Sequence, residues 1–174
     1  GPLIVTPNHQ TYADPALVTI PVRRRVYYMA WDRLFEIPGF SWLIRRLRAF
    51  PVRIDAADPL SMREAVRLLT AGHVLMIFPE GERTVTGRVE RFKLGAFRLA
   101  ATLRVPVLPV TIVGGHEVWP PGRTLPRRGR ISITYHPPLK PDPALEPRRA
   151  AADLAQRVRA VIAASLGDTA APGT

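Results

Sequence analysis

A histidine and an aspartate five positions apart are the residues of this chain whose types and spacing most directly suggest chemistry. His9 and Asp14 lie just after the short apolar segment Leu3–Thr6. A carboxylate bound to one imidazole nitrogen orients the ring and stabilises its protonated form, which leaves the other nitrogen to act as a general base. The alternative is structural, because Asp14 precedes Pro15 and this pair commonly starts a helix, with the aspartate as cap.

The sequence offers no protein nucleophile to accompany this pair. Cysteine is absent, and no serine lies in a G-x-S-x-G turn or in a polar loop after a strong strand. A covalent acyl-enzyme is therefore not favoured, and we expect the pair to activate a hydroxyl that arrives with the substrate. The serines are Ser41, Ser61, Ser132 and Ser165.

A polar loop, Pro79–Phe92, follows the apolar segment His73–Phe78 and is a second candidate for chemistry. Gly81 allows a positive φ and a close backbone approach to a ligand. Arg83 offers a fork of N–H donors for a phosphate or carboxylate, and Glu80 could orient Arg83 or bind a substrate hydroxyl. The alternative is a surface loop with an incidental Glu–Arg pair, worth about 0–1 kcal/mol.

The surrounding pattern predicts an α/β fold: a single domain with a mostly parallel central sheet flanked by helices. In such sheets ligands bind beyond the carboxyl ends of the strands, where both candidate segments lie. Pro109 should lie at a sheet edge or in a bulge. The domain is expected over residues 1–166, with a disordered tail over 167–174. The expected strands are Leu3–Thr6, Val26–Ala30, Phe50–Ile54, His73–Phe78, Val107–Val113 and Ile131–Tyr135. The expected helices are Asp58–Ala71, Gly95–Leu103, Pro147–Leu166 and one that starts at Asp14.

The charge of the chain predicts a polyanionic partner. Twenty-five Lys and Arg residues against 14 Asp and Glu give a net charge of +11, which attracts nucleic acid, anionic lipid or phosphorylated ligands. A nucleic-acid-binding module is a distant alternative, because no recognition motif is present. His116 and His136 have no carboxylate at metal-ligand spacing, so no metal site is expected.

Membrane contact is expected at the surface only. No apolar run reaches the roughly 18 residues of a spanning helix, and no secretory signal is visible. The segment Phe40–Phe50 combines apolar residues at helical spacing with Arg45, Arg46 and Arg48. Such a basic amphipathic helix suits an anionic bilayer interface, although a core helix is the equal alternative.

Several blocks of the chain resemble, in the same order, those of the glycerolipid acyltransferase superfamily, typified by bacterial 1-acylglycerol-3-phosphate acyltransferases. Together they cover about Ile4 to Val113. The resemblance implies that family's glycerol-3-phosphate acyltransferase-like fold. The blocks are Asn8-His9 with Asp14 (H-x4-D), Phe50-Pro51-Val52-Arg53, Phe78-Pro79-Glu80-Gly81 with Arg83 (F-P-E-G-x-R), Arg91–Gly95 (F-K-x-G) and Val105–Val110 (V-P-x-x-P-V).

The resemblance implies an O-acyltransferase in which His9 is the general base and Asp14 orients it. The acceptor alkoxide would attack the thioester of acyl-CoA or acyl carrier protein, with no further cofactor. The acceptor would be a lysophospholipid, most simply 1-acylglycerol-3-phosphate giving phosphatidic acid, or another lysolipid of the superfamily. The expected location is peripheral, on the cytoplasmic face of the cell membrane.

The resemblance also implies substrate-binding residues. Arg53 and Arg83 would hold the acceptor phosphate, with Lys93 as a weaker candidate, and Glu80 and Gly81 would line the substrate site. Backbone N–H groups near Gly81 would stabilise the oxyanion.

This chain departs from the family pattern in two places. Glu82 stands where Thr is frequent, and Arg48-Ala49-Phe50 lacks a usual glycine. Both departures bear on the acceptor more than on the chemistry. The family's membrane-anchoring helices before the H-x4-D motif are not seen here, so we expect either a fragment or another mode of membrane binding.

Overall fold

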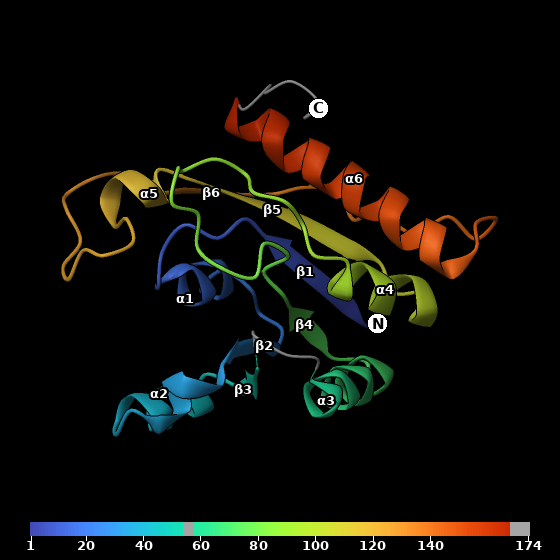
Figure 1. The fold of residues 1–174 in the computed structure, drawn as a ribbon, viewed down its shortest axis with the longest axis horizontal. Coiled ribbons are helices and arrows are strands. Elements are labelled where there is room, and N and C mark those ends of the chain that lie inside the picture. Colours follow the sequence, from blue (N-terminus) through green and yellow to red (C-terminus); the bar gives the residue numbers. More distant parts are fainter. Residues whose placement is uncertain (54–57, 168–174) are drawn as a thin grey trace.

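A computed structural model describes residues 1–53 and 58–167, which form one α/β domain around a six-stranded sheet (Figure 1). The strand order is β3-β2-β4-β1-β5-β6, and every neighbouring pair is parallel except β5 with β6. The predicted fold class is therefore confirmed. The strands are β1 (Leu3–Pro7), β2 (Val26–Trp31), β3 (Ala49–Val52), β4 (Val74–Met76), β5 (Val107–Val113) and β6 (Ser132–Tyr135).

Helices connect these strands, and α3 begins and ends at residues that local rules favour. The carboxylate of Asp58 caps α3 by accepting bonds from the N–H groups of Leu60 and Ser61. Gly72, with φ +81°, follows the end of the same helix. The helices are α1 (Asp14–Thr19), a 3-10 helix η1 (Asp32–Glu36), α2 (Phe40–Arg46), α3 (Pro59–Thr70), α4 (Gly95–Leu103), α5 (Gly115–Val118) and α6 (Pro147–Leu166).

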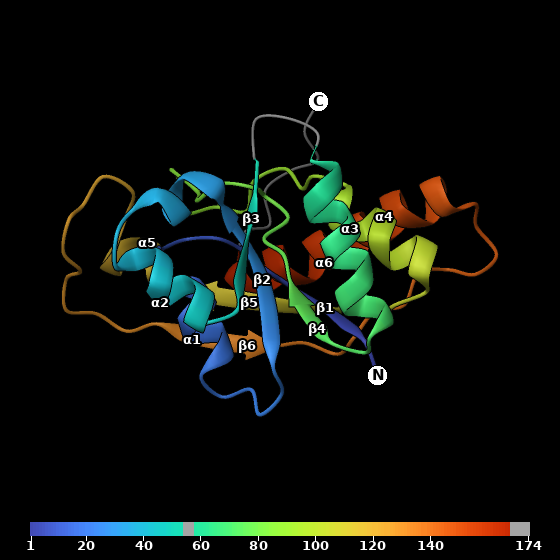
Figure 2. The ribbon, with the colours of Figure 1, turned by 90° about the horizontal axis from the view of Figure 1, so that it is seen from below.

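Two apolar clusters hold helices against the two faces of the sheet. One cluster joins α3, α4 and α6 to the sheet and includes the fully buried Leu75, Phe97 and Leu154. The other includes Val18 of α1 and Ile44 of α2 with residues of the central strands. Figure 2 shows α1 and α2 on the opposite side of β2 from α3 and α4. No helix among the described residues is long and apolar enough to cross a bilayer.

Some expected boundaries differ from the structure. Phe50 lies in β3 and packs beside the α3–α4–α6 cluster, so it does not belong to the helix that contains Phe40. The helix stops at Arg46, and Arg48 takes a positive φ of 68° in the turn that starts β3. The expected strand end at Ile54 and all but the first residue of the expected tail, 167–174, lie outside the described residues.

Pro109 lies in the interior strand β5, paired with Thr6 of β1, so an edge position is wrong. On its other side the pairing with the β6 segment slips by one residue between Tyr135 and Leu139. This bulge spares Pro109 from having to donate a ladder hydrogen bond, which agrees with the expected alternative.

Candidate active site

The candidate pair lies at the carboxyl end of β1, where the chain turns into α1. His9 Nδ1 lies 2.9 Å from Asp14 Oδ2. The Asp14 side chain is fully buried, while that of His9 is 18% exposed. The His9 ring stacks on Phe78, with ring centroids 4.0 Å apart. The ring is therefore fixed on one side and accessible to a ligand through the part that stays exposed.

The Asp14 side chain accepts hydrogen bonds from the loop that precedes α1 and does not cap the helix. Asp14 Oδ2 accepts from the backbone N–H groups of Gln10 at 2.6 Å and Thr11 at 2.8 Å, in addition to the His9 contact. Asp14 Oδ1 accepts from the Thr11 hydroxyl at 2.6 Å. The N-cap position belongs to Ala13, which makes no side-chain cap bond, so the cap interpretation of Asp14 is wrong. Because the carboxylate only accepts, Nδ1 of His9 carries the hydrogen and Nε2 keeps the lone pair of a base.

Glu80 holds the backbone of the candidate base. The His9 N–H donates to Glu80 Oε1 at 2.9 Å, and the Glu90 N–H donates to Glu80 Oε2 at 3.0 Å. The Thr84 N–H in turn donates to the His9 carbonyl at 2.8 Å. Glu80 makes no ion pair with Arg83, so its contacts differ from the expected Glu–Arg orientation. Burial outweighs the two N–H donors and raises the pKa of Glu80 from 4.5 to about 7.

The turn after Glu80 is closely packed and leaves specific amides free. Gly81 has φ +81°, and a Cβ there would lie 2.6 Å from the ammonium nitrogen of Lys93. The Gly81 N–H donates to the Phe78 carbonyl at 3.1 Å, so it is not available to an oxyanion in this structure. The amides of Glu82 and Arg83 have no acceptor within the described ranges.

Arg83 is the candidate anion ligand that the structure brings to this loop. Its guanidinium carbon lies 3.5 Å from the centre of the Tyr12 ring, and Tyr12 also meets Trp119 edge-on. Arg83 Nη1 is buried and has no hydrogen-bond partner. An unpaired buried cationic donor is costly, because no protein group replaces the water it has lost. An anion bound at this position would supply the missing acceptor.

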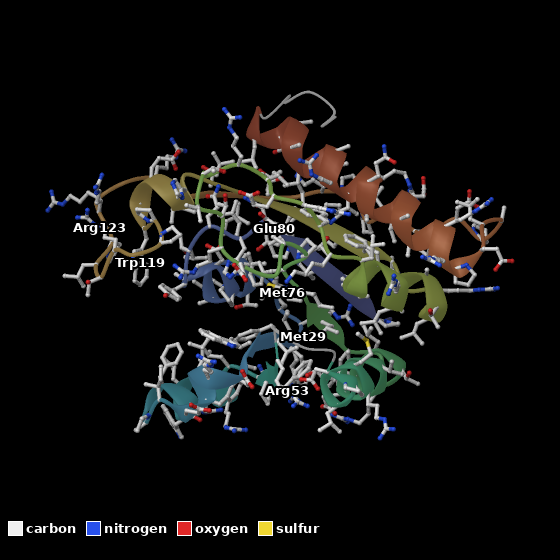
Figure 3. All side chains as sticks on the ribbon, viewed as in Figure 1. Met29, Arg53, Met76, Glu80, Trp119 and Arg123 are labelled. Atoms are coloured by element: carbon white, nitrogen blue, oxygen red, sulfur yellow. The ribbon has the colours of Figure 1, made fainter. Side chains whose placement is uncertain are left out.

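The structure does not place Arg53 beside His9, Asp14 and Arg83. It follows β3, and two strands, β2 and β4, separate β3 from β1. Three strand spacings of about 4.8 Å each put β3 roughly 14 Å from β1. In Figure 3, Met29 and Met76 lie between Arg53 and Glu80. The exposed side chain of Arg53 lies near the same edge of the sheet but outside the cluster around His9.

Three polar residues hold the His9–Asp14 pair in position, although the sequence interpretation gave them no role. The Asn8 side chain bonds both the N–H and the carbonyl of Ile112, which ties the end of β1 to β5. Gln10 Oε1 accepts from the N–H groups of Gly115 and His116. Thr11 contacts both oxygens of Asp14. Their signal in the sequence is a run of polar residues beside the histidine, directly after an apolar strand.

The other histidines have separate surroundings. His73 packs against Tyr27, and His136 Nε2 lies 2.7 Å from the Thr111 hydroxyl. His116 packs over Gly87, and its buried Nδ1 has no partner. Within residues 1–53 and 58–167 no group of three His, Cys, Asp or Glu residues could hold a metal ion.

Comparison with known proteins places this geometry in a family. A family model described as Acyltransferase matches residues 1–113, which include His9, Asp14 and the whole 79–92 loop. The chain belongs to the acyltransferase family. The catalytic pair expected from the sequence and the loop that clamps it therefore lie inside the segment that defines the family.

The relatives of this acyltransferase domain carry names that describe the same kind of enzyme. It is 29% identical over 140 residues to a 1-acyl-sn-glycerol-3-phosphate acyltransferase of Pseudomonas aeruginosa, covering 78% of this chain and 52% of that protein. It is 28% identical over 137 residues to the enzyme of that name from Bacillus subtilis, covering 78% and 66%. The crystal structure of the 1-acyl-sn-glycerophosphate acyltransferase PlsC of Thermotoga maritima superposes with a TM-score of 0.79 at 30% identity, covering 99% of this chain and 68% of that one.

The matched region is only part of several relatives. The alignment spans 41% of a chloroplastic 1-acyl-sn-glycerol-3-phosphate acyltransferase of Brassica napus and 39% of one from Arabidopsis thaliana. What these whole proteins do is therefore carried to this chain as a proposal.

Proposed function

We propose that this chain transfers a fatty acyl group from a thioester to the free hydroxyl of 1-acylglycerol-3-phosphate, giving phosphatidic acid. The observation that carries the proposal is the buried Asp14 carboxylate on Nδ1 of a partly exposed His9, whose backbone N–H and carbonyl are both hydrogen-bonded. This arrangement presents one basic nitrogen in a fixed place, which general base catalysis requires. The names of the relatives support the acceptor, and another lysolipid of the same class is the alternative.

The reaction proceeds in two proton-coupled steps. Nε2 of His9 takes the proton of the acceptor hydroxyl while its oxygen attacks the thioester carbonyl carbon. The resulting oxyanion is met by backbone donors, for which we assign the free amides of Glu82 and Arg83 in place of Gly81. The carbon–sulfur bond then breaks, and the imidazolium returns the proton to the leaving thiolate. Asp14 balances the charge of the imidazolium between the two steps.

Arg83 holds the acceptor phosphate in this proposal. Its unpaired buried Nη1 supports the assignment, since a phosphate oxygen would complete its hydrogen bonding. Lys93, whose side chain lies over Gly81, is placed to add a second positive charge. Arg53 lies at the same edge of the sheet and would contact only a part of the substrate that extends toward β3.

The donor is a thioester, either acyl-CoA or acyl carrier protein, and it is the only co-substrate the proposed steps need. Each step is assigned to protein groups and the two substrates, so no cofactor is invoked. Because lysolipids and their products partition into bilayers, we place the protein at the membrane surface. The cytoplasmic face is the one where both kinds of thioester donor are made available.

The decisive experiment replaces the candidate base. His9→Ala should fold normally and lose about 10²–10⁴-fold in acyl transfer, the usual share of general base catalysis. His73→Ala, which removes another half-buried imidazole, is the matched control and should retain activity. Transfer is measured with both donors against a panel of lysolipids. Near-normal turnover by a folded His9→Ala protein would refute the assignment, and a preference for another lysolipid would change only the acceptor.

A further inference from the structure

Among the described residues, the largest concentration of exposed large apolar side chains lies in α2 and in the residues that flank α2 and η1. We call it the α2 face. Trp42 is 68% exposed and Ile37 49%, which is unusual for side chains of this size. The α2 face consists of Trp31, Ile37, Phe40, Trp42, Leu43 and Leu47.

The periodicity of α2 shows how this face is built. Ile44 is the buried residue of the helix and packs into the second core cluster. Phe40, Leu43 and Leu47 are the i−4, i−1 and i+3 neighbours of Ile44 and flank it, while Trp42, two positions from Ile44, lies on the side of the helix that points away from it. The helix therefore buries one residue, while Phe40, Trp42, Leu43 and Leu47 each keep at least 40% of their surface exposed.

Cations surround the α2 face. Between residues 31 and 48, Arg33, Arg45, Arg46 and Arg48 outnumber Asp32 and Glu36. Two of these arginines are packed on the aromatic rings below them: the guanidinium carbon of Arg33 lies 5.2 Å from the Trp31 ring centre, and that of Arg45 lies 4.8 Å from the Phe35 ring centre. Stacking keeps both charges beside the apolar surface.

The α2 face lies on the outside of the described structure. In Figure 1, α2 lies at the end of the molecule opposite α6, and in Figure 2, seen from below, it faces the viewer. In Figure 1 no other helix or strand of the described residues lies below α2.

We propose that the α2 face is the surface by which this domain docks on an anionic lipid bilayer. Leucine and phenylalanine side chains enter the interface, Trp31 and Trp42 lie at the headgroup level that indole prefers, and the arginines contact anionic headgroups. The excess of positive charge favours a negatively charged surface over a second copy of this basic chain. The choice of a bilayer rests on the proposed function, but docking is measured without any substrate.

The charge of the face is tested by sedimentation of the purified chain with vesicles. Binding to phosphatidylglycerol vesicles should exceed binding to phosphatidylcholine vesicles and fall with added salt. Arg45→Glu with Arg46→Glu should weaken binding at least about tenfold. The matched control is Arg127→Glu with Arg128→Glu, which makes the same charge change on exposed arginines of another loop and should have a much smaller effect. Equal losses in both double variants would mean that net charge alone drives binding and would overturn the proposal.

The apolar part is tested by tryptophan fluorescence, since the chain has three tryptophans. A variant that keeps only Trp42 should shift to shorter wavelength on anionic vesicles, whereas one that keeps only Trp119 should not. Trp42→Ala should weaken binding, while Leu60→Ala, equally exposed at 68% on α3, should not. An unshifted Trp42, or a Trp42-dependent dimer that ignores vesicles, would overturn the proposal. Transfer to a soluble short-chain acceptor should persist in all these variants, so inactivity there would count against the proposed function and leave docking standing.

Discussion

At the scale of single residues, two buried carboxylates lie beside the candidate base His9 and have different tasks. Glu80 binds the backbone N–H of His9, while Asp14 binds the ring. A glutamate whose two oxygens accept backbone donors from His9 and Glu90 joins the end of β1 to the 79–92 loop. We therefore regard Glu80 as a positioning residue.

The raised pKa of Glu80 predicts a pH-dependent stability. A carboxyl group with a pKa of about 7 when folded and 4.5 as its ordinary value stabilises the fold below pH 4.5 and loses that contribution as the pH rises through 7. Between pH 5 and pH 8 the free energy of unfolding should therefore fall in the wild type relative to Glu80→Gln, by on the order of 2–3 kcal/mol. Urea unfolding at the two pH values measures this difference. Glu82→Gln, the same change at an exposed neighbour, should show no such relative fall.

Arg83 gives the second prediction at this scale. If its buried Nη1 bonds the acceptor phosphate, Arg83→Gln removes a charge-assisted bond of about 1.5–3 kcal/mol, which raises the KM for the acceptor about 10- to 150-fold. Arg88→Gln, at an exposed position of the same loop, is the control and should leave KM unchanged. A change confined to the KM of the thioester donor would show that Arg83 binds the other substrate.

At the scale of elements, α3 depends on its first residues more than its neighbours do. Asp58 caps the helix, bonds the Ser61 hydroxyl and accepts from the backbone N–H of Arg53 at 3.0 Å. These bonds, led by that of the Ser61 hydroxyl, lower the pKa of Asp58 to about 2. The same carboxylate therefore fixes both the start of α3 and the position of Arg53 at the end of β3.

Removing this cap should destabilise the protein by about 0.5–2 kcal/mol in Asp58→Ala. Because the pKa is lowered on folding, the contribution is present above pH 3.8 and is lost as the pH falls toward 2. The gap in unfolding free energy between wild type and variant should narrow over that range. Asp153→Ala, which breaks only the exposed pair with Arg157 on α6, should cost less than about 0.5 kcal/mol. An equal cost in both variants would show that the cap contributes no more than a surface ion pair.

At the scale of the whole molecule, the last helix supports the site from outside, and its Arg159 donates to the carbonyls of Val89 and Glu90 in the 79–92 loop. α6 packs on α4 and β5, so it lies across the sheet on the far side from α2 (Figure 1). Leu154, Val158 and Ile162 are fully buried in that contact. The family match ends at residue 113, before this helix begins.

Leu154→Ala should therefore lower the free energy of unfolding by about 2–5 kcal/mol, since it leaves a cavity in the main core. Leu145→Ala, at a residue 37% exposed before the helix, should cost much less. Denaturant unfolding compares the two variants, and activity well below the unfolding midpoint should be preserved in both. A loss under 1 kcal/mol for Leu154→Ala would mean that α6 can repack without the leucine.

The sequence by itself determined the elements and the identity of the main chemical groups. Alternation of apolar segments predicted the α/β fold, and the apolar pattern predicted the bounds of α4, β5 and α6 correctly. The spacing of His9 and Asp14 allowed the contact that the structure shows. These features are local, because hydrogen bonding within a helix and apolar periodicity depend on neighbours in the chain.

Only the tertiary structure decided how those groups are held and which of them meet. It assigned Glu80 to the His9 backbone, used the Gly81 N–H within its own turn, and separated Arg53 from the pair by two strands. It also showed that Asp14 bonds the preceding loop and that α2 leaves Phe40, Trp42 and Leu43 exposed. Strand order and the path of a loop depend on packing between distant segments, which no local pattern in the sequence encodes.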